Sequence, residues 1–169
     1  MDALERGGVD AVKVQALSRA LGVTKGSFYW HFKTRDALLM AVLDFWESAG
    51  TQDIISTMES ADLAPEDRPQ ALWQIVTASG RMGAEMALRD WARRDPRAQE
   101  VVERVDRQRL DFTRQMYEDL GHDTVQAEAR SILGYCMLIG LHFVGNSGRE
   151  VPEEEAVAAA LALLTKAPD

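Results

Sequence analysis

The chain has 169 residues, 46% of them hydrophobic, and a formal net charge of −8 at pH 7. This length and apolar content suffice for one compact unit with a real core and are small for two independent domains. The negative charge argues against a uniformly basic nucleic-acid-binding protein.

Targeting signals and disulfides are not expected. The single cysteine, Cys136, cannot form an internal disulfide, and no stretch holds the roughly 18 consecutive apolar residues that a membrane span needs. The N-terminal segment MDALERGG lacks the basic and apolar regions of a secretory signal. We therefore expect a soluble, cytoplasmic protein with no membrane partner.

The charge is unevenly distributed along the chain. Residues 1–40 hold six Lys or Arg and four acids, a net charge of +2, whereas the remainder holds 13 Lys or Arg and 23 acids, a net charge of −10. This division indicates a small head that contacts a polyanion, attached to an acidic body.

The first elements of the chain have helical spacing. Val14, Leu17 and Leu21 recur at intervals of three and four, which predicts a helix with one buried face that stops at Gly22. Thr24 is placed to cap the next helix. That short helix is expected to have an apolar back and a polar, aromatic front. The back carries Phe28 and Phe32, and the front carries Lys25, Tyr29 and Lys33.

A longer helix is predicted to follow. Thr34 is its expected cap, and Asp36 suits the positive end of a helix dipole. We expect this helix to run past Glu47. Its buried stripe is predicted to consist of Leu38, Leu39, Val42, Leu43 and Trp46.

Prolines, glycines and capping residues divide the rest of the chain into further helices, and no strand-like alternation or repeat is found. The predicted fold class is therefore all-α. A loop around Pro65 and Pro69 is expected before a helix with Leu72, Trp73, Ile75 and Val76, and a further helix is expected at 86–92. Asp95 and Pro96 should open a long helix that ends at Gly121. Asp123 and Gln126 should open a helix that reaches about Gly145, and a last helix should follow Pro152.

The segment ALSRALGVTKGSFYWHF has the form of a helix-turn-helix, in which the second helix enters the major groove of DNA. Lys25 can reach base-edge acceptors, Gly26 lets the backbone come close, and Tyr29 offers a base both a ring and a hydroxyl. Donors that suit phosphate oxygens are Ser27, His31, Lys33 and Arg35.

The segment LGVTKGSFYWHFKTRDALL resembles the DNA-binding signature of TetR-family transcriptional regulators, in its Tyr-x-His-Phe core and in the Leu-rich helix that follows. The resemblance covers about residues 8–47 closely, and DWARRDPRAQEVVERVDRQR looks like a stretch that recurs in many members. It implies base contacts from Gln15, Lys25, Gly26 and Tyr29, and phosphate contacts from Ser27, Trp30, His31, Lys33 and Arg35. Thr24 belongs to the same predicted DNA-binding set.

The resemblance also implies an architecture and partners. A helix-turn-helix DNA-binding head at residues 1–47 is expected on a helical effector-binding and dimerisation body at residues 48–169. A homodimer would bind a palindromic operator in double-stranded DNA, most often as a repressor, and a small-molecule effector in the body would control the DNA affinity.

The beginning of the chain departs from the family pattern. Only MDALERGG precedes the turn at Gly7 and Gly8, so the start of the family's first helix and its flexible basic arm are missing from the sequence. Two interpretations stay open: a DNA-binding regulator with a short first helix, and an N-terminally truncated, dimeric helical ligand-binding protein that does not bind DNA.

The body offers candidate residues for an effector pocket and for a dimer interface. Methionine adapts to irregular ligands, although a methionine or aromatic residue of this kind more often belongs to the core. The pocket set is Trp73, Met86, Phe112, Met116, Met137 and His142. The interface set is Gly134, Leu138, Leu141 and Gly145 on one helix with Val157, Ala160, Leu161 and Leu164 on the last. The alternative is that both faces are buried within one chain.

No catalytic or metal site is predicted. The three histidines are far apart, and the sequence has neither an H-E-x-x-H motif, nor a glycine-rich phosphate loop, nor a nucleophile elbow. His122 is expected simply to follow a helix end. We therefore expect neither an enzyme nor a cofactor.

Overall fold

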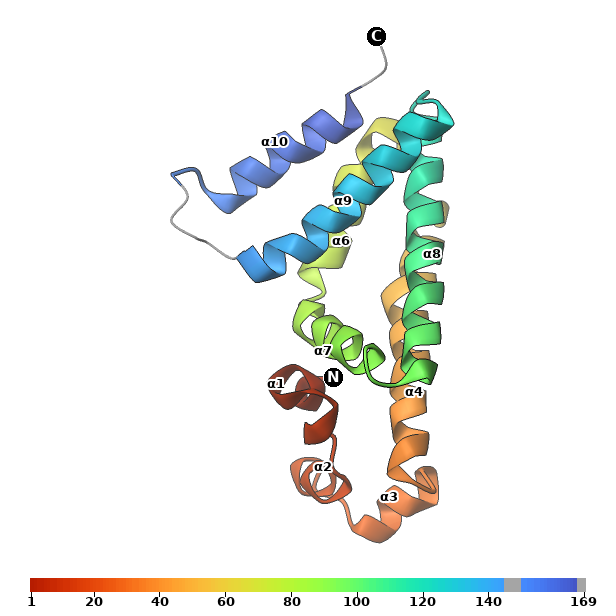
Figure 1. Cartoon of the computed structure of the whole chain (residues 1–169), viewed down its shortest axis with the longest axis vertical. Helices are drawn as coiled ribbons and strands as arrows, with labels where there is room; N and C mark the ends of the chain where they lie inside the picture. Colours follow the sequence, from red (N-terminus) through yellow and green to blue (C-terminus); the bar gives the residue numbers. More distant parts are fainter. Residues whose placement is uncertain (145–149, 167–169) are drawn as a thin grey trace. The chain divides into compact units, whose positions relative to one another are not determined.

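The computed structural model describes residues 1–144 and 150–166 (Figure 1). Regular structure in these ranges is helical throughout, without a strand, which confirms the all-α fold class. In chain order the helices are α1 (Asp2–Ala11), α2 (Val14–Ala20), α3 (Lys25–His31), α4 (Arg35–Glu47), the π-helical turn η1 (Ser48–Gln52), α5 (Asp53–Ser60), the 3-10 turn η2 (Pro65–Asp67), α6 (Arg68–Ala78), α7 (Met82–Ala92), α8 (Pro96–Asp119), α9 (Thr124–Val144) and α10 (Glu153–Thr165).

The chain forms two compact units. The first unit consists of Met1–Asp53 with Ser79–Asp106, and the second of Ile54–Ala78 with Arg107–Asp169. The helix-turn-helix segment therefore shares its unit with α7 and with the first part of α8. The boundary predicted at residue 47 does not coincide with the division into these two units, and it stays a prediction.

The predicted caps open the helices as expected. Thr24 Oγ1 accepts a hydrogen bond from the Ser27 N–H (3.1 Å) at α3, and Thr34 Oγ1 accepts one from the Ala37 N–H (3.0 Å) at α4. At α8 the Asp95 carboxylate accepts from the Arg97 N–H (3.0 Å), and at α9 the Asp123 carboxylate accepts from the Gln126 N–H (2.8 Å). Each cap satisfies an N–H group that the helix itself leaves without an acceptor.

Two glycines end helices with the positive φ angles that L-residues avoid. Gly22 has φ 65° just after α2, and Gly121 has φ 90° just after α8. This confirms both predicted stops. The burial predicted for Leu21 is wrong, because α2 ends at Ala20 and Leu21 lies in the turn with 73% of its surface exposed.

The helix that begins at Arg35 continues past Glu47, as predicted, through the π-helical turn η1 into α5. Just before this turn the carboxylate of Glu47, a buried residue, accepts hydrogen bonds from Nε and Nη2 of Arg104 at 2.7 and 2.6 Å. Within the turn, the carbonyl of Ala49 accepts one from Arg81 Nη1 (3.1 Å). Arg104 belongs to α8 and Arg81 directly precedes α7, so both contacts hold the turn within the first unit.

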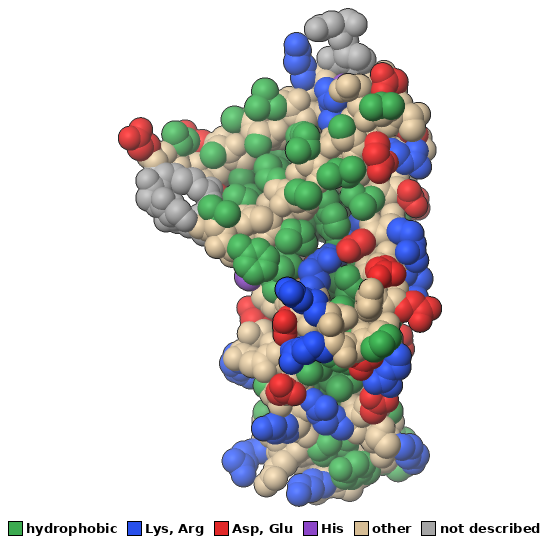
Figure 2. Space-filling view, in the orientation of Figure 1, with side chains coloured by type: hydrophobic (Ala, Val, Ile, Leu, Met, Phe, Trp, Pro, Cys, Tyr) green, Lys and Arg blue, Asp and Glu red, His purple; other side chains and the backbone are tan. Residues whose placement is uncertain are grey.

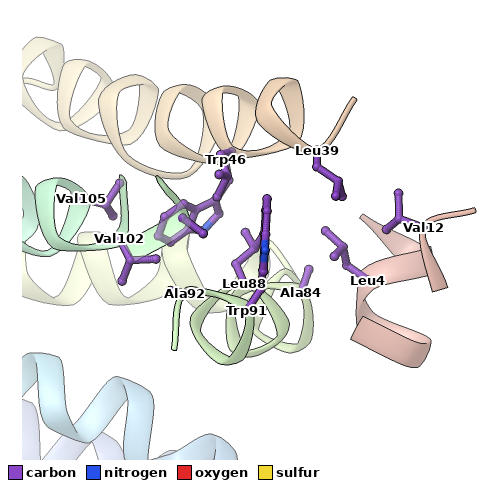
Figure 3. Close-up of a cluster of buried hydrophobic side chains, with 12 residues drawn as sticks. Leu4, Val12, Leu39, Trp46, Ala84, Leu88, Trp91, Ala92, Val102 and Val105 are labelled. Atoms are coloured by element: carbon purple, nitrogen blue, oxygen red, sulfur yellow. The ribbon is translucent and has the colours of Figure 1, made fainter. Parts of the chain in front are cut away.

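The first unit has a core to which four helices contribute (Figure 3). Leu88 and Trp91 of α7 lie between Trp46 of α4 on one side and Leu4 of α1 on the other (Figure 3). Val105 of α8 is also fully buried in this cluster. The apolar stripe predicted for α4 thus packs against α7 and α8.

Helix α1 is fixed by a second, polar contact. It is kinked at Gly7 and Gly8, and Gly8 has φ 62°, which a residue with a Cβ would adopt only with strain. Beyond the kink, Arg35 of α4 donates from Nε to the Val12 carbonyl (2.6 Å) and from Nη2 to the Val9 carbonyl. The end of α1 is therefore tied to the start of α4.

The second unit is built from α5, α6, the later part of α8, α9 and α10. Helices α8 and α9 meet at Ser131, whose hydroxyl lies 2.6 Å from Thr113 Oγ1 and donates to the Leu110 carbonyl at 3.0 Å. Arg130 of α9 donates from Nε to the Leu164 carbonyl of α10 at 3.0 Å. Within residues 1–144 and 150–166, no helix is both long and apolar enough to cross a bilayer.

Candidate nucleic-acid interface

Helices α2 and α3 pack against each other across a short turn, and α3 is anchored by one aromatic residue. Phe28 of α3 is 8% exposed, and its ring lies 5.7 Å from that of Phe32 and edge-on to that of Tyr29 (5.3 Å). The predicted apolar back of α3 is thereby confirmed at Phe28, while Phe32 is half-buried. This anchor fixes which side of α3 faces outward.

The outward side of α3 carries the predicted DNA-binding residues. Tyr29 and Trp30 are 47% and 75% exposed, although apolar surface of this size is normally buried. The Trp30 ring lies edge-on to the His31 ring, with 4.6 Å between the ring centroids. The other exposed members of the predicted set are Gln15, Thr24, Lys25, Gly26, Ser27, His31 and Lys33. Figure 2 shows Lys and Arg side chains around α2 and α3, at the bottom of the view.

Two features prepare this surface for a polyanion. In the described part of the chain, neither Lys25 nor Lys33 forms a salt bridge, so each ammonium group is available to a phosphate or a base. Gly26 has open space beside it: a Cβ placed there would meet only Thr24 Oγ1, at 3.6 Å. The fold itself therefore does not require glycine at this position.

Residues 1–42 match the family model described as "Bacterial regulatory proteins, tetR family". The head of this chain is a tetR-family N-terminal domain. This match supports a DNA-binding regulator of the TetR type. No curated protein and no solved structure matched the chain significantly.

One member of the predicted DNA-binding set is already engaged. Arg35 of the tetR-family head is only partly exposed, and it donates to the Val9 and Val12 carbonyls. Its charge still lies near the start of α4, but its guanidinium group is committed to α1. No sequence signal predicts this contact, because the partners are 23 and 26 residues apart and are backbone atoms.

A further arginine reaches the start of α4 from outside the matched segment. Arg97, in the first turn of α8, donates from Nη1 and Nη2 to the two carboxylate oxygens of Asp36 at 2.8 and 2.9 Å. This pair was not predictable from the sequence, since 61 residues separate the partners and nothing local indicates the contact. It joins the tetR-family head to α8 within the first unit.

The predicted effector residues are distributed over both units. Met86 belongs to the first unit, and Trp73, Phe112, Met116, Met137 and His142 belong to the second. Met116 is buried and His142 is exposed, while the other members are half-buried. The membership of these residues in a pocket stays a prediction.

One pair of predicted interface residues lies between α9 and α10. Gly134 lies so close to α10 that a Cβ there would be 3.6 Å from Leu164 Cδ1. Val157 and Leu161 are buried, and Leu138, Leu141, Ala160 and Leu164 are half-buried. Gly145 lies outside the described residues. The membership of these residues in a dimer interface stays a prediction.

His122 is more enclosed than its place after a helix end suggested. Its side chain is buried beside the Tyr117 ring (6.4 Å), and its Nε2 atom has no hydrogen-bond partner among the described residues. Burial, followed by the nearby charge of Arg130, lowers the pKa of His122 below its ordinary value. The fold therefore favours the neutral form of the imidazole.

Proposed function

We propose that this TetR-type regulator is a homodimeric transcriptional repressor that binds a palindromic operator and changes its DNA affinity when a small-molecule effector binds the body. The observation that carries the proposal is the exposed row of polar and aromatic side chains around the buried anchor Phe28 of α3. A helix with such a surface suits the major groove of DNA.

The proposed roles follow from side-chain chemistry. Gln15, Lys25, Gly26 and Tyr29 are the base-reading residues, because an amide, an ammonium group, a bare backbone and a phenol can each engage a base edge. Ser27, Trp30, His31 and Lys33 bind the phosphate backbone, and Arg35 adds its charge from the start of α4. Thr24 supports both groups by capping α3.

A second copy of the chain is the proposed partner of an apolar face on α9 and α10. Val125, Ile132, Cys136 and Phe143 are exposed, and at about 100° per residue they fall within one narrow sector of α9. That sector is opposite Gly134, Leu138 and Leu141. On α10, Leu163 is 75% exposed. Figure 2 shows hydrophobic side chains gathered over these two helices.

A dimer of this kind suits the proposed operator. A palindrome presents two half-sites related by a two-fold axis, and a homodimer with one self-complementary face presents two recognition helices with the same symmetry. The effector would act by population shift, since a ligand that prefers one conformation of the dimer lowers DNA affinity only as far as it prefers that conformation. Half-buried Trp73, Phe112 and Met137 of the second unit are the proposed contacts for an apolar ligand.

The test of DNA binding is selection of bound sequences from a random duplex library at moderate salt. Enrichment of one palindrome is the expected result. Lys25→Ala should then relax the sequence preference, while Lys33→Ala should weaken binding to all duplexes alike and reduce the slope of log K against log salt by about 1. Absence of any enriched sequence would refute the regulator proposal and favour a dimeric helical ligand-binding protein that does not bind DNA.

The test of the dimer is a charge placed in the proposed face. Ile132→Glu should convert the dimer to a monomer in size-exclusion chromatography with light scattering, because the carboxylate would be buried opposite its own copy. The control is Ser56→Glu, which adds the same charge at an exposed position of α5. A dimer that survives Ile132→Glu would rule out this face.

A further inference from the structure

The first turn of α4 has an acid where the proposed DNA contacts have cations. Asp36 follows Lys33 and Arg35 by three residues and one, and its carboxylate is more than half exposed. An acid in this position stabilises the helix, because the first turn has the positive end of the helix dipole. The same charge repels a phosphate that approaches Lys33. One turn of helix thus has two opposed electrostatic requirements.

Arg97 forms a salt bridge with Asp36. Its Nη1 and Nη2 atoms donate to Asp36 Oδ2 and Oδ1 at 2.8 and 2.9 Å, which is a bidentate geometry. Its Nε and Nη2 atoms also donate to Asp95, at 3.2 and 2.9 Å. Asp95 is in turn fixed by its role as the cap of α8. The guanidinium group is therefore positioned by a residue that the fold already requires.

All three groups stay ionised in the fold. The hydrogen bonds from Arg97 hold the pKa of Asp36 below its ordinary value, and they lower the pKa of Asp95 to about 2. The same bonds raise the pKa of Arg97 above its ordinary value. At neutral pH the cluster is a permanent cation between two permanent anions.

We propose that Arg97 is a positioning residue for DNA binding, which acts by cancelling the charge of Asp36 so that a phosphate can reach Lys33 at the start of α4. This inference rests on the DNA-binding function proposed above. It assigns a role in DNA binding to a residue of α8, outside the matched helix-turn-helix segment at residues 1–42. Asp36 can then stabilise the first turn of α4 without weakening the interface.

The chain contains a matched control for Arg97. Arg94, three residues earlier, is similarly exposed and forms an ion pair of 2.6 Å with Asp90 in the preceding helix. Both changes, Arg97→Gln and Arg94→Gln, remove one positive charge from the same part of the sequence. Only Arg97 contacts Asp36, so only Arg97→Gln should leave an uncompensated acid at the start of α4.

The experiment measures the dissociation constant and its salt dependence by fluorescence anisotropy, on the selected duplex and on a duplex of unrelated sequence. Arg97→Gln should weaken binding to both duplexes about three- to tenfold at 0.1 M salt, which is the effect of about one counterion. Arg94→Gln should change binding by less than about twofold. The decisive variant is Arg97→Gln combined with Asp36→Asn, which should bind within about twofold of the parent.

The outcomes separate the possible failures. If the double variant binds as weakly as Arg97→Gln, Arg97 acts as a mechanical link rather than through charge, and the inference is overturned. The same conclusion follows if Arg97→Gln binds as tightly as the parent. A parent that retains no duplex at all refutes the proposed function, and this inference with it.

Discussion

Replacing Gly26 with alanine should separate what the fold requires from what the DNA requires. A Cβ at this position would meet only Thr24 Oγ1, at 3.6 Å, which is ordinary van der Waals contact. The φ angle of Gly26 is not positive, so alanine is not strained there. Alanine is favoured over glycine inside a helix by about 0.5–1 kcal/mol. Since Gly26 is the second residue of α3, we expect a gain in unfolding free energy near the lower value.

The effect on DNA binding should have the opposite sign. If the backbone at Gly26 lies against a base edge, the added methyl group must be accommodated between two surfaces already in contact. An extra methyl in a packed contact costs about 1–3 kcal/mol. That cost corresponds to a dissociation constant about five- to 150-fold higher.

Two measurements on the same Gly26→Ala protein check this reasoning: urea unfolding followed by circular dichroism, and anisotropy with the selected duplex. The contrast is Gly22→Ala, where φ is 65° and alanine should cost about 1–2 kcal/mol of stability even though the space around it is open. A Gly26→Ala variant that binds with the affinity of the parent would show that α3 does not approach DNA at this residue. Loss of stability in Gly26→Ala would contradict the structural argument itself.

Three further predictions concern stability, each measured by the urea midpoint. Leu88→Ala should lower the unfolding free energy by about 2–5 kcal/mol, because Leu88 is fully buried between α1, α4 and α8; a loss below 1 kcal/mol would contradict that burial. Asp123→Ala should lower the unfolding free energy by about 0.5–2 kcal/mol, because α9 loses its cap. Asp123→Asn should retain most of the stability that the cap contributes. The parent should lose stability as the pH falls below about 6.5, because the unfolded chain protonates His122 and the fold, with its lowered pKa, does not; the slope from one proton is at most about 1.4 kcal/mol per pH unit. His122→Gln should remove this contribution to the pH dependence of the unfolding free energy. A variant with the same pH dependence as the parent would refute the assignment of that dependence to His122.

Local signals made the helix boundaries predictable. Thr24, Thr34, Asp95 and Asp123 each cap the helix that follows, because a cap depends only on residues two or three positions away. Leu21 was misassigned for a related reason: its spacing continues the apolar stripe of α2, but the helix ends one residue earlier. The spacing of side chains does not reveal where the backbone leaves the helix.

Long-range contacts were not predictable. Arg35 looked like a phosphate ligand by its position and is instead bonded to the carbonyls of Val9 and Val12. The Arg97–Asp36 pair joins residues 61 positions apart, and several other acids in the sequence could have been partners. Side-chain chemistry limits the kinds of partner an arginine takes, but only the packing of α1, α4, α7 and α8 selects among them.

The orientation of α9 was ambiguous for a different reason. Both of its faces are apolar, one with Gly134 and the other with Ile132 and Phe143. Periodicity identifies an apolar face without showing whether it packs within the chain or on another copy. In the structure Gly134 lies against Leu164 of α10, and the part that either face plays in a dimer stays a prediction.

The shared core of the first unit limits how this regulator can be recombined with others. Leu4 and Leu39 of the head are buried against Ala84, Leu88 and Trp91, which lie beyond residue 78. A chimera that joins residues 1–53 to the body of another regulator would expose these side chains, unless the donor segment also supplied 79–106. During divergence, substitutions in the head and in α7 are therefore expected to occur together, so that operator preference can change freely only on the outer side of α3.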